Sequence, residues 1–327
     1  MTSSDSIIKK YYNKEALSGQ VFLIMTGFNC NNNCLMCSVR PKGLFHSPRP
    51  KEDILKDIKD GKKQNYQRIE FTGGEPTLRG DILDLIAEAN KIGYQEIAIS
   101  TNARMLSIPK YLDKLIENGL NRVTTTLYGP NKNIHEVITR TPGSFQQTIN
   151  GIRNVIKNNI PITVNTVLFS LTAPYLKQTG LFINYLGVKH WTLLDLIPDG
   201  YALEKYDFFS LSPSKIRSAF NSIVPILDKF ELVNIFDFPF CLIPENIFEH
   251  QNCNILAAKG RTKIIKQVGY KPNRFKKESN VYYDIHKIRS PKCAFCKYNK
   301  ECGGFWKSYL NNYDGDLIKP IKSKIIY

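Results

Sequence analysis

The chain has 327 residues, 42% of them hydrophobic, and carries a formal net charge of +16 at pH 7. This length suits one α/β barrel with a small appendage better than one small domain, and the hydrophobic content excludes global disorder. No apolar run approaches the roughly 20 residues of a membrane span, and Met1 to Gln20 lacks an apolar secretory core, so we expect a cytoplasmic protein.

Strand-like and helix-like segments alternate along most of the chain. Strands are predicted at Gln20–Thr26, Arg68–Thr72, Glu96–Thr101, Arg122–Leu127, Pro161–Phe169 and His190–Ile197. Helices are predicted at Pro50–Asn65, Asp81–Ile92, Pro109–Asn118, Ser144–Asn158, Pro174–Leu186 and Ser212–Phe230. About six βα units in series predict an α/β fold with a parallel sheet, either open or curled into a partial barrel.

The alternation stops near residue 232, where a cysteine-rich, basic segment begins. Residues 255–327 hold 17 lysines and arginines against 5 aspartates and glutamates. Such a region favours an anionic partner such as nucleic acid, a phosphorylated metabolite or an acidic peptide, but it equally suits a solvated surface. Because no nucleic-acid motif accompanies the charge, we expect a peptide or small anionic substrate rather than nucleic acid.

Three cysteines follow the first predicted strand in a Cx3Cx2C pattern, namely Cys30, Cys34 and Cys37. Disulfides are not expected in a chain without an export signal. Three thiolates from one loop can bind three irons of a cubane, which leaves the fourth iron open to a cofactor or substrate. Zinc is the alternative, but a closed structural zinc site takes four ligands and no neighbouring residue supplies the fourth.

This loop resembles that of the radical S-adenosylmethionine (SAM) superfamily. The resemblance implies a partial (β/α)6 barrel of the TIM type and a [4Fe-4S] cluster whose fourth iron is chelated by SAM. It also implies an external electron donor of the flavodoxin or ferredoxin type. Reductive cleavage of SAM would give a 5′-deoxyadenosyl radical that abstracts a hydrogen from the substrate. Met36, the residue before the last cysteine, would lie near the adenine.

A second motif, Gly73-Gly74-Glu75-Pro76, ends the second predicted strand. Glycines there allow a close backbone approach to a ligand, and Glu75 can accept a hydrogen bond. In isolation the motif would indicate only a turn. After a Cx3Cx2C loop it resembles the superfamily motif whose backbone carbonyls bind the amino group of the cofactor.

Further candidate cofactor-binding residues lie at or after the ends of later strands. Polar groups at two strand ends resemble those that hold the ribose or the methionyl carboxylate, although strand capping is the alternative. An arginine after the fourth strand could pair with a carboxylate. The fifth strand offers an asparagine for the lumen or the core, and the segment after the sixth could line the adenine or pack in the core. These residues are Ser100, Asn102, Thr126, Arg140, Asn165 and Ile197.

Five cysteines follow the barrel at positions 241, 253, 293, 296 and 302. The Cx2Cx5C spacing resembles SPASM regions, but Trp306 occupies the next expected cysteine position. The resemblance therefore implies the shorter twitch-like form with one auxiliary [4Fe-4S] cluster. We favour Cys241, Cys293, Cys296 and Cys302 as its ligands. Cys253 could replace Cys302, one iron could stay open, or four cysteines could hold zinc.

The remaining thiol, Cys253 in the favoured set, would be inert or would donate a hydrogen atom to a substrate radical. We expect an N-terminal extension at 1–15, the radical SAM barrel at 16–231 and the twitch- or SPASM-like domain at 232–327. The leading functional hypothesis is a maturase that oxidises, crosslinks or epimerises a ribosomally made peptide. The alternatives are a radical SAM enzyme for a nucleotide, sugar or aminocyclitol, and a non-enzymatic metal- or nucleic-acid-binding protein.

Overall fold

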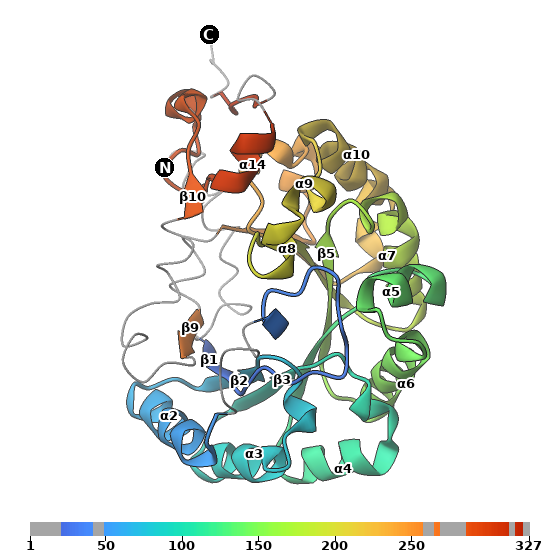
Figure 1. Cartoon of the computed structure of the whole chain (residues 1–327), viewed down its shortest axis with the longest axis vertical. Helices are drawn as coiled ribbons and strands as arrows, with labels where there is room; N and C mark the ends of the chain where they lie inside the picture. Colours follow the sequence, from blue (N-terminus) through green and yellow to red (C-terminus); the bar gives the residue numbers. More distant parts are fainter. Residues whose placement is uncertain (1–20, 42–48, 258–264, 269–285, 314–317, 323–327) are drawn as a thin grey trace.

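The computed structural model describes residues 21–41, 49–257, 265–268, 286–313 and 318–322. Its main element is a parallel sheet with the strand order β8-β7-β6-β5-β4-β3-β2-β1-β9, which curls into a partial barrel (Figure 1). The strands are β1 Val21–Met25, β2 Arg68–Thr72, β3 Glu96–Ser100, β4 Arg122–Thr126, β5 Ile162–Leu168, β6 His190–Asp195, β7 Leu232–Phe236, β8 Cys253–Leu256 and β9 Ile265–Val268.

Helices connect successive strands and cover the outer face of the sheet (Figure 1). The larger ones are α2 Lys51–Lys63, α3 Ile82–Lys91, α4 Pro109–Glu117, α5 Lys132–Thr139, α6 Ser144–Lys157, α7 Leu176–Tyr185 and α10 Pro213–Ile223. Shorter ones are α8 Tyr201–Glu204, α9 Tyr206–Phe209, α11 Glu245–Phe248 and α14 Lys307–Asn312. The α/β partial-barrel fold expected from the sequence is confirmed, and all six expected strands are present.

The sheet extends three strands beyond the six that the sequence pattern indicated. β7 and β8 continue it in parallel register past residue 231, and β9 pairs with β1 at the other edge. β8 and β9 have four residues each, and the only α-helix between β7 and β8 is the short α11. The βα rhythm alone therefore did not reveal this part of the sheet. The domain boundaries at 15 and 231 stay predictions, and residues 1–20 lie outside the described part of the chain.

Side chains of the strands alternate between an apolar outer layer and an interior that mixes polar and apolar groups, as the period of two allows. Outward side chains such as Phe71, Ile99 and Trp191 are fully buried against the helices. Inward side chains such as Thr72 and Ser100 face an internal cavity. Because the interior of this barrel is hollow and carries polar groups among apolar ones, it is suited to binding rather than to core packing.

The C-terminal region lies against the carboxyl ends of β6 and β7. Its small hairpin pairs β10, Lys287–Ile288, with β11, Phe305–Trp306. The indole of Trp306 donates to the Asp195 carboxylate at 2.9 Å, and the Lys287 ammonium donates to the Asp237 carbonyl at 2.6 Å. These buried polar contacts fix the hairpin to the rim of the barrel.

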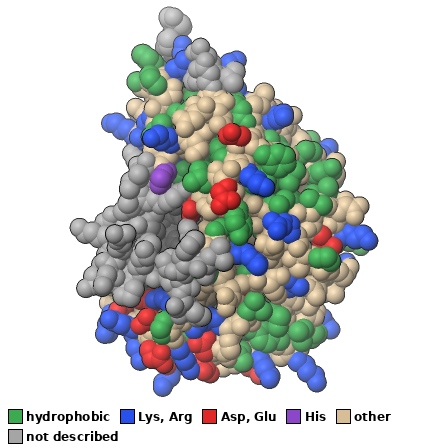
Figure 2. All heavy atoms as spheres, in the orientation of Figure 1, with side chains coloured by type: hydrophobic (Ala, Val, Ile, Leu, Met, Phe, Trp, Pro, Cys, Tyr) green, Lys and Arg blue, Asp and Glu red, His purple; other side chains and the backbone are tan. Residues whose placement is uncertain are grey.

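On the face in Figure 2, the basic side chains of the described residues are dispersed and mixed with acidic ones. This distribution suits a solvated surface better than a nucleic-acid footprint on that face. No helix in the described segments is both long and apolar enough to cross a bilayer.

Candidate active site

An internal cavity of about 570 Å³ occupies the barrel and is lined by side chains from all strands β1 to β8. All three cysteines of the first loop, Cys30, Cys34 and Cys37, line this cavity. They follow β1 directly, so the loop lies at the carboxyl ends of the strands, where parallel α/β folds place their chemistry.

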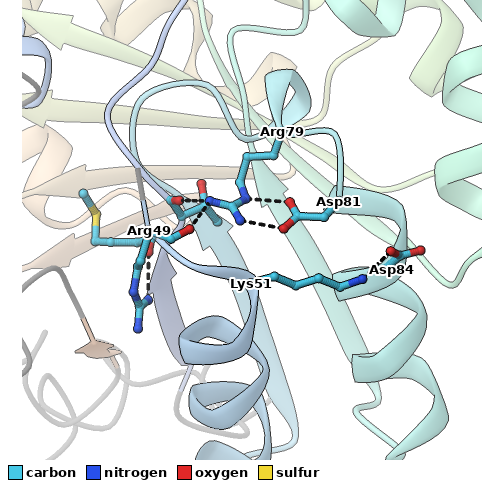
Figure 3. Close-up of polar contacts among 7 residues, drawn as sticks. Arg49, Lys51, Arg79, Asp81 and Asp84 are labelled. Atoms are coloured by element: carbon cyan, nitrogen blue, oxygen red, sulfur yellow. Dashed lines mark hydrogen bonds and ion pairs between the residues drawn. The ribbon is translucent and has the colours of Figure 1, made fainter. Parts of the chain in front are cut away.

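Two arginines fasten the outer side of this loop to the barrel (Figure 3). Arg79 donates to the carbonyls of Thr26 at 2.7 Å and Arg49 at 2.9 Å, and forms a bidentate pair with Asp81 at 2.7–2.8 Å. Arg49 in turn donates to the Met25 carbonyl at 2.9 Å. The carbonyls at the end of β1, which sheet pairing leaves free, thereby gain charged donors that fix the exit of the strand.

Backbone contacts fix the inner course of the loop. The amides of Asn33 and Leu35 donate to the carbonyls of Thr139 and Ile138, both at 2.9 Å. These two acceptors are the last carbonyls of α5, which have no partner within the helix. The cysteine loop therefore caps α5, and these backbone hydrogen bonds to the helix fix the conformation of the loop.

Two of the three thiols, Cys30 and Cys37, have hydrogen-bond donors close by. The Asn32 amide lies 3.4 Å and the Asn102 side-chain amide 3.8 Å from the Cys30 sulfur, and the Arg40 amide lies 3.1 Å from the Cys37 sulfur. Burial, followed by the neighbouring Cys37 and Cys30, raises the pKa of Cys34 to about 12. Donors to sulfur stabilise the thiolates that a metal requires.

Gly73 and Gly74 permit a close backbone approach to the cysteine loop. Gly74 donates to the Gly27 carbonyl at 2.8 Å, and the next amide, Glu75, donates to the Asn29 carbonyl at 2.7 Å. Gly73 has a positive φ of 134°, and a Cβ there would lie 2.5 Å from the Gly27 oxygen. A Cβ on Gly74 would overlap the Asn29 oxygen. Only glycine fits at either position.

The Glu75 side chain binds to neighbouring parts of the protein and does not face the cavity. Its buried carboxylate accepts hydrogen bonds from the Thr77 hydroxyl at 2.5 Å, the Thr101 hydroxyl at 2.6 Å and the Asn102 amide at 2.7 Å. Burial raises the pKa of Glu75, and these donors oppose that shift. The carboxylate joins the end of β2 to the end of β3, and it does not line the cavity.

Most of the predicted cofactor-binding residues surround the same cavity. Those that line it are Met36, Gly73, Gly74, Ser100, Asn102, Thr126, Asn165 and Ile197. Three others lie elsewhere. Glu75 and Pro76, the last two residues of the motif, are buried and do not line the cavity. Arg140 is exposed at the end of α5, where its backbone is left-handed. Sequence pattern could not separate these three, because a strand-end position does not show which way its side chain points.

Four of the five later cysteines line one narrow pocket, namely Cys241, Cys293, Cys296 and Cys302. Burial, then the adjacent Cys302, Cys293 and Cys296, raises the pKa of Cys241 to about 12. The described residues contain no group of three or more His, Cys, Asp or Glu side chains set around a single metal-ion position. The shared pocket nevertheless brings together the favoured set of auxiliary ligands, whose role stays a prediction.

Cys253 lies apart from both cysteine groups. It is in β8, where the alternate residues Asn254 and Leu256 line the cavity, so its side chain points to the opposite face of the sheet. Burial, then the charge of Asp228, raises the pKa of Cys253 to about 12. This position favours an inert buried thiol and gives no support to hydrogen-atom donation into the cavity.

Comparison with known proteins agrees with this arrangement. Residues 24–179 match the family model described as the radical SAM superfamily. The chain carries a radical SAM domain over these residues. A radical SAM domain implies SAM and a [4Fe-4S] cluster as cofactors. The residues fit both groups, because three thiols from one loop and the Gly73-Gly74 backbone face a single cavity.

Among curated proteins, the chain is 30% identical over 207 residues to a probable GTP 3′,8-cyclase of Sulfurisphaera tokodaii, covering 62% of this chain and 63% of that protein. It is 33% identical over 145 residues to a GTP 3′,8-cyclase of Petrotoga mobilis, covering 42% of this chain and 44% of that protein. The matches thus span less than two thirds of these relatives.

Solved structures resemble the fold over more of the chain. Streptococcus suis SuiB bound to SAM matches with a TM-score of 0.63 at 14% identity, covering 98% of this chain and 81% of SuiB. The protein anSMEcpe with bound SAM matches with a TM-score of 0.61 at 15% identity, covering 91% of this chain and 92% of that protein. At 14% and 15% sequence identity, these similarities show a shared fold only.

A row of polar side chains across the sheet was not evident from the sequence. Thr126, Asn165, Thr192, Asn234 and Asn254 are paired in register on β4 to β8, and all five line the cavity. The Asn234 amide donates to the Thr192 hydroxyl at 3.3 Å. Only strand register reveals this row, because its members are up to 128 residues apart along the chain.

Proposed function

We propose that this protein is a radical SAM maturase that removes a hydrogen atom from a ribosomally made peptide and leaves an oxidised, crosslinked or epimerised residue. The observation that carries the proposal is the shared cavity of Cys30, Cys34, Cys37 and the Gly73-Gly74 backbone. When bound and reduced, the cluster and SAM supply hydrogen-atom abstraction from an unactivated C–H bond. The chain itself holds, orients and encloses the reacting groups.

Three features of the cavity support cofactor and substrate positioning by this chain. The three thiols can ligate three irons and leave one for the SAM amino acid group. Ser100 and Asn102 lie at the same rim as the cysteines and offer hydroxyl and amide groups for the sugar or carboxylate of SAM. The polar row on β4 to β8 then provides donors and acceptors for a substrate deeper in the barrel.

The charge of the cavity favours a peptide group over a polyphosphate. Three arginines and four carboxylates are among the described residues that line it, namely Arg40, Arg68, Arg122, Glu70, Glu96, Asp195 and Asp237. Arg68 and Arg122 lie 2.7 and 3.7 Å from the Glu96 carboxylate, and Arg40 donates to the Cys30 and Asn32 carbonyls. With its arginines thus engaged, the cavity suits neutral or cationic groups rather than a triphosphate.

The second cysteine pocket supports an auxiliary [4Fe-4S] cluster. Four thiols occupy all four irons of a cubane, so such a site suits electron transfer better than direct substrate binding. An external donor of the flavodoxin or ferredoxin type would supply the first electron. SuiB has also been solved bound to the precursor peptide SuiA, and this supports the peptide hypothesis by analogy of fold.

The second candidate is a radical SAM enzyme that acts on a nucleotide. It is favoured by the 30% identity to a probable GTP 3′,8-cyclase. The two candidates differ in their expected substrates, so incubation with GTP and with precursor-like peptides separates them. A product formed from GTP would favour the nucleotide enzyme, whereas a peptide that changes mass with SAM and reductant would favour the maturase.

Anaerobic reconstitution tests what both candidate functions require, namely an iron–sulfur cluster that cleaves SAM. We expect dithionite and SAM to yield 5′-deoxyadenosine with the wild-type protein but not with a Cys34→Ala variant. Two clusters correspond to about eight irons per chain, and replacing Cys241 and Cys296 together should lower the count to about four. A reduced, iron-loaded wild-type protein that never cleaves SAM would instead indicate a metal-binding scaffold.

A further inference from the structure

The wall of the cavity formed by β5 to β8 carries two rows of side chains. The deeper one is the β5–β8 part of the polar row described above, and the one nearer to the carboxyl ends is apolar. Both rows are paired in register across the four strands. All eight side chains line the cavity, namely Asn165, Thr192, Asn234 and Asn254 in the polar row and Val167, Leu194, Phe236 and Leu256 in the apolar row.

The two rows have the spacing of a regular sheet. Neighbouring strands lie about 4.8 Å apart, so each row is about 14 Å long, and a step of two residues along the strands sets the rows about 7 Å apart. A ligand that lies along the strand direction therefore crosses the apolar row first and reaches the polar row with its far end. This order suits one side chain with an apolar stem and a polar tip.

The carboxamides of the polar row have hydrogen-bonding groups to offer a ligand. The Asn234 side-chain amide donates to the Thr192 hydroxyl at 3.3 Å, which uses one of its two N–H groups. Within the described segments, no residue forms a hydrogen bond with the side chain of Asn165 or Asn254. Because partly buried polar groups are normally paired, these carboxamides favour a ligand that supplies matching donors and acceptors.

The eight side chains of this wall carry no formal charge. The arginines and glutamates of the cavity come from other parts of it, and the carboxylates of Asp195 and Asp237 follow the apolar row at the rim. Asp195 accepts from the Trp306 indole there. A charged tip in the polar row would lose water without meeting an opposite charge in either row, whereas a neutral tip can be satisfied by the carboxamides.

The strand order separates this wall from the residues predicted to hold the cofactor. Those residues follow β1, β2 and β3, and β4 lies between them and the wall. The apolar row is the one nearer to the rim that carries the cysteine loop. A substrate side chain whose tip is held in the polar row would thus leave its backbone and first carbons near that rim.

We propose that the β5–β8 wall is a substrate subsite that selects an uncharged side chain with an apolar stem and a hydrogen-bonding tip, such as that of tyrosine or glutamine. The inference rests on the proposed function, since it names the kind of residue that the peptide would present. The stem lies against the apolar row, and the tip exchanges hydrogen bonds with Asn234 and Asn254. The subsite thereby sets which C–H bond lies closest to the cofactor side of the cavity.

Capped pentapeptides of the form acetyl-Gly-Gly-X-Gly-Gly-amide test this selection. Their dissociation constants are measured by ligand-observed NMR with anaerobically reconstituted, SAM-bound protein. We expect the peptide with tyrosine at X to bind about tenfold more tightly than the one with phenylalanine, because only the hydroxyl can pair with the carboxamides. Glutamine at X should exceed glutamate for the reason of charge given above.

An Asn234→Leu, Asn254→Leu double variant should lose the preference for tyrosine and bind the phenylalanine peptide at least as well as wild type does. The control is Thr124→Val, which removes a cavity hydroxyl on β4 outside the wall and should keep the preference. If the double variant does not fold, Asn254→Asp is the second test. Its carboxylate should tighten binding of the peptide with lysine at X, and an unchanged affinity would contradict the subsite.

The outcomes separate this inference from the proposed function. A wild-type protein that cleaves SAM but binds the tyrosine and phenylalanine peptides equally, or binds neither, would overturn this inference alone. A double variant that keeps the preference for tyrosine would do the same. Displacement of the tyrosine peptide by guanosine, together with a product formed from GTP, would overturn the proposed maturase and this inference with it.

Discussion

Gly74 lies against the backbone that leads into the first cysteine loop, so a single methyl group there tests how the cavity is built. A Cβ at Gly74 would overlap the Asn29 carbonyl oxygen and lie 2.6 Å from the Phe28 carbonyl carbon and oxygen. These atoms belong to backbone and cannot rotate away. The Gly74→Ala variant must therefore separate the motif from the loop.

Separation has two costs that the structure allows us to size. Overpacking of a tight contact costs about 1–3 kcal/mol. The two backbone hydrogen bonds that join the segments, at 2.8 and 2.7 Å, contribute about 0.5–1.5 kcal/mol each. Because relaxation relieves part of the overlap as these bonds lengthen, we expect a total loss of about 2–4 kcal/mol in the free energy of unfolding.

Urea unfolding of the iron-free protein measures this loss, and SAM binding by the reconstituted protein measures its effect on the site. Gly80→Ala is a matched control in the same segment, because a Cβ there has no atom within 4 Å, and we expect a change within about 0.5 kcal/mol. A Gly74→Ala protein as stable as Gly80→Ala, with undiminished SAM binding, would refute the close-approach argument.

Three further changes test separate parts of the structure. Burial raises the pKa of Asp195 to about 7, partly offset by Lys287. The folded protein therefore binds this proton more tightly than the unfolded chain, so wild-type stability should fall relative to Asp195→Asn as pH rises from about 4 to 7. Parallel urea titrations check this, and a pH-independent difference would contradict it. An Arg79→Lys variant cannot reproduce the bidentate pair with Asp81 and both carbonyl contacts. We therefore expect its free energy of unfolding in urea to fall by about 1–3 kcal/mol and its iron loading to decrease. Unchanged values would contradict the role of Arg79 in fixing the end of β1. Cys253→Ala should retain full 5′-deoxyadenosine formation and iron content, whereas loss of about half the iron would place this thiol among the ligands.

Local features of the chain were predictable because they depend on neighbours in sequence. The Cx3Cx2C loop and the Gly-Gly step both lie directly after strands, and parallel folds collect such positions at one rim. Strands β1 to β6 were also predictable, because the pattern of apolar residues that identifies a strand is local in sequence. β8 was missed, since a strand of four residues without a flanking long helix has little periodic pattern to detect. β7 follows α10 but lies at the start of the cysteine-rich segment, which was assigned to another domain.

Side-chain direction at the ends of the strands was not predictable. Glu75 belongs to a motif that resembles a cofactor site, yet three neighbouring donors turn its carboxylate into the scaffold. Arg140 follows a strand as expected, but the left-handed end of α5 leaves it exposed. Both outcomes depend on partners from other strands or on a local φ value, neither of which composition or spacing encodes.

The sequence by itself determined the chemistry of the first site, because three thiols within eight residues must share one loop wherever that loop lies. It also limited the second site to five cysteines. Only the tertiary structure decided that Cys241 joins Cys293, Cys296 and Cys302, while Cys253 faces the other side of β8. Strand register sets that choice, since a shift of one residue reverses the face of every side chain.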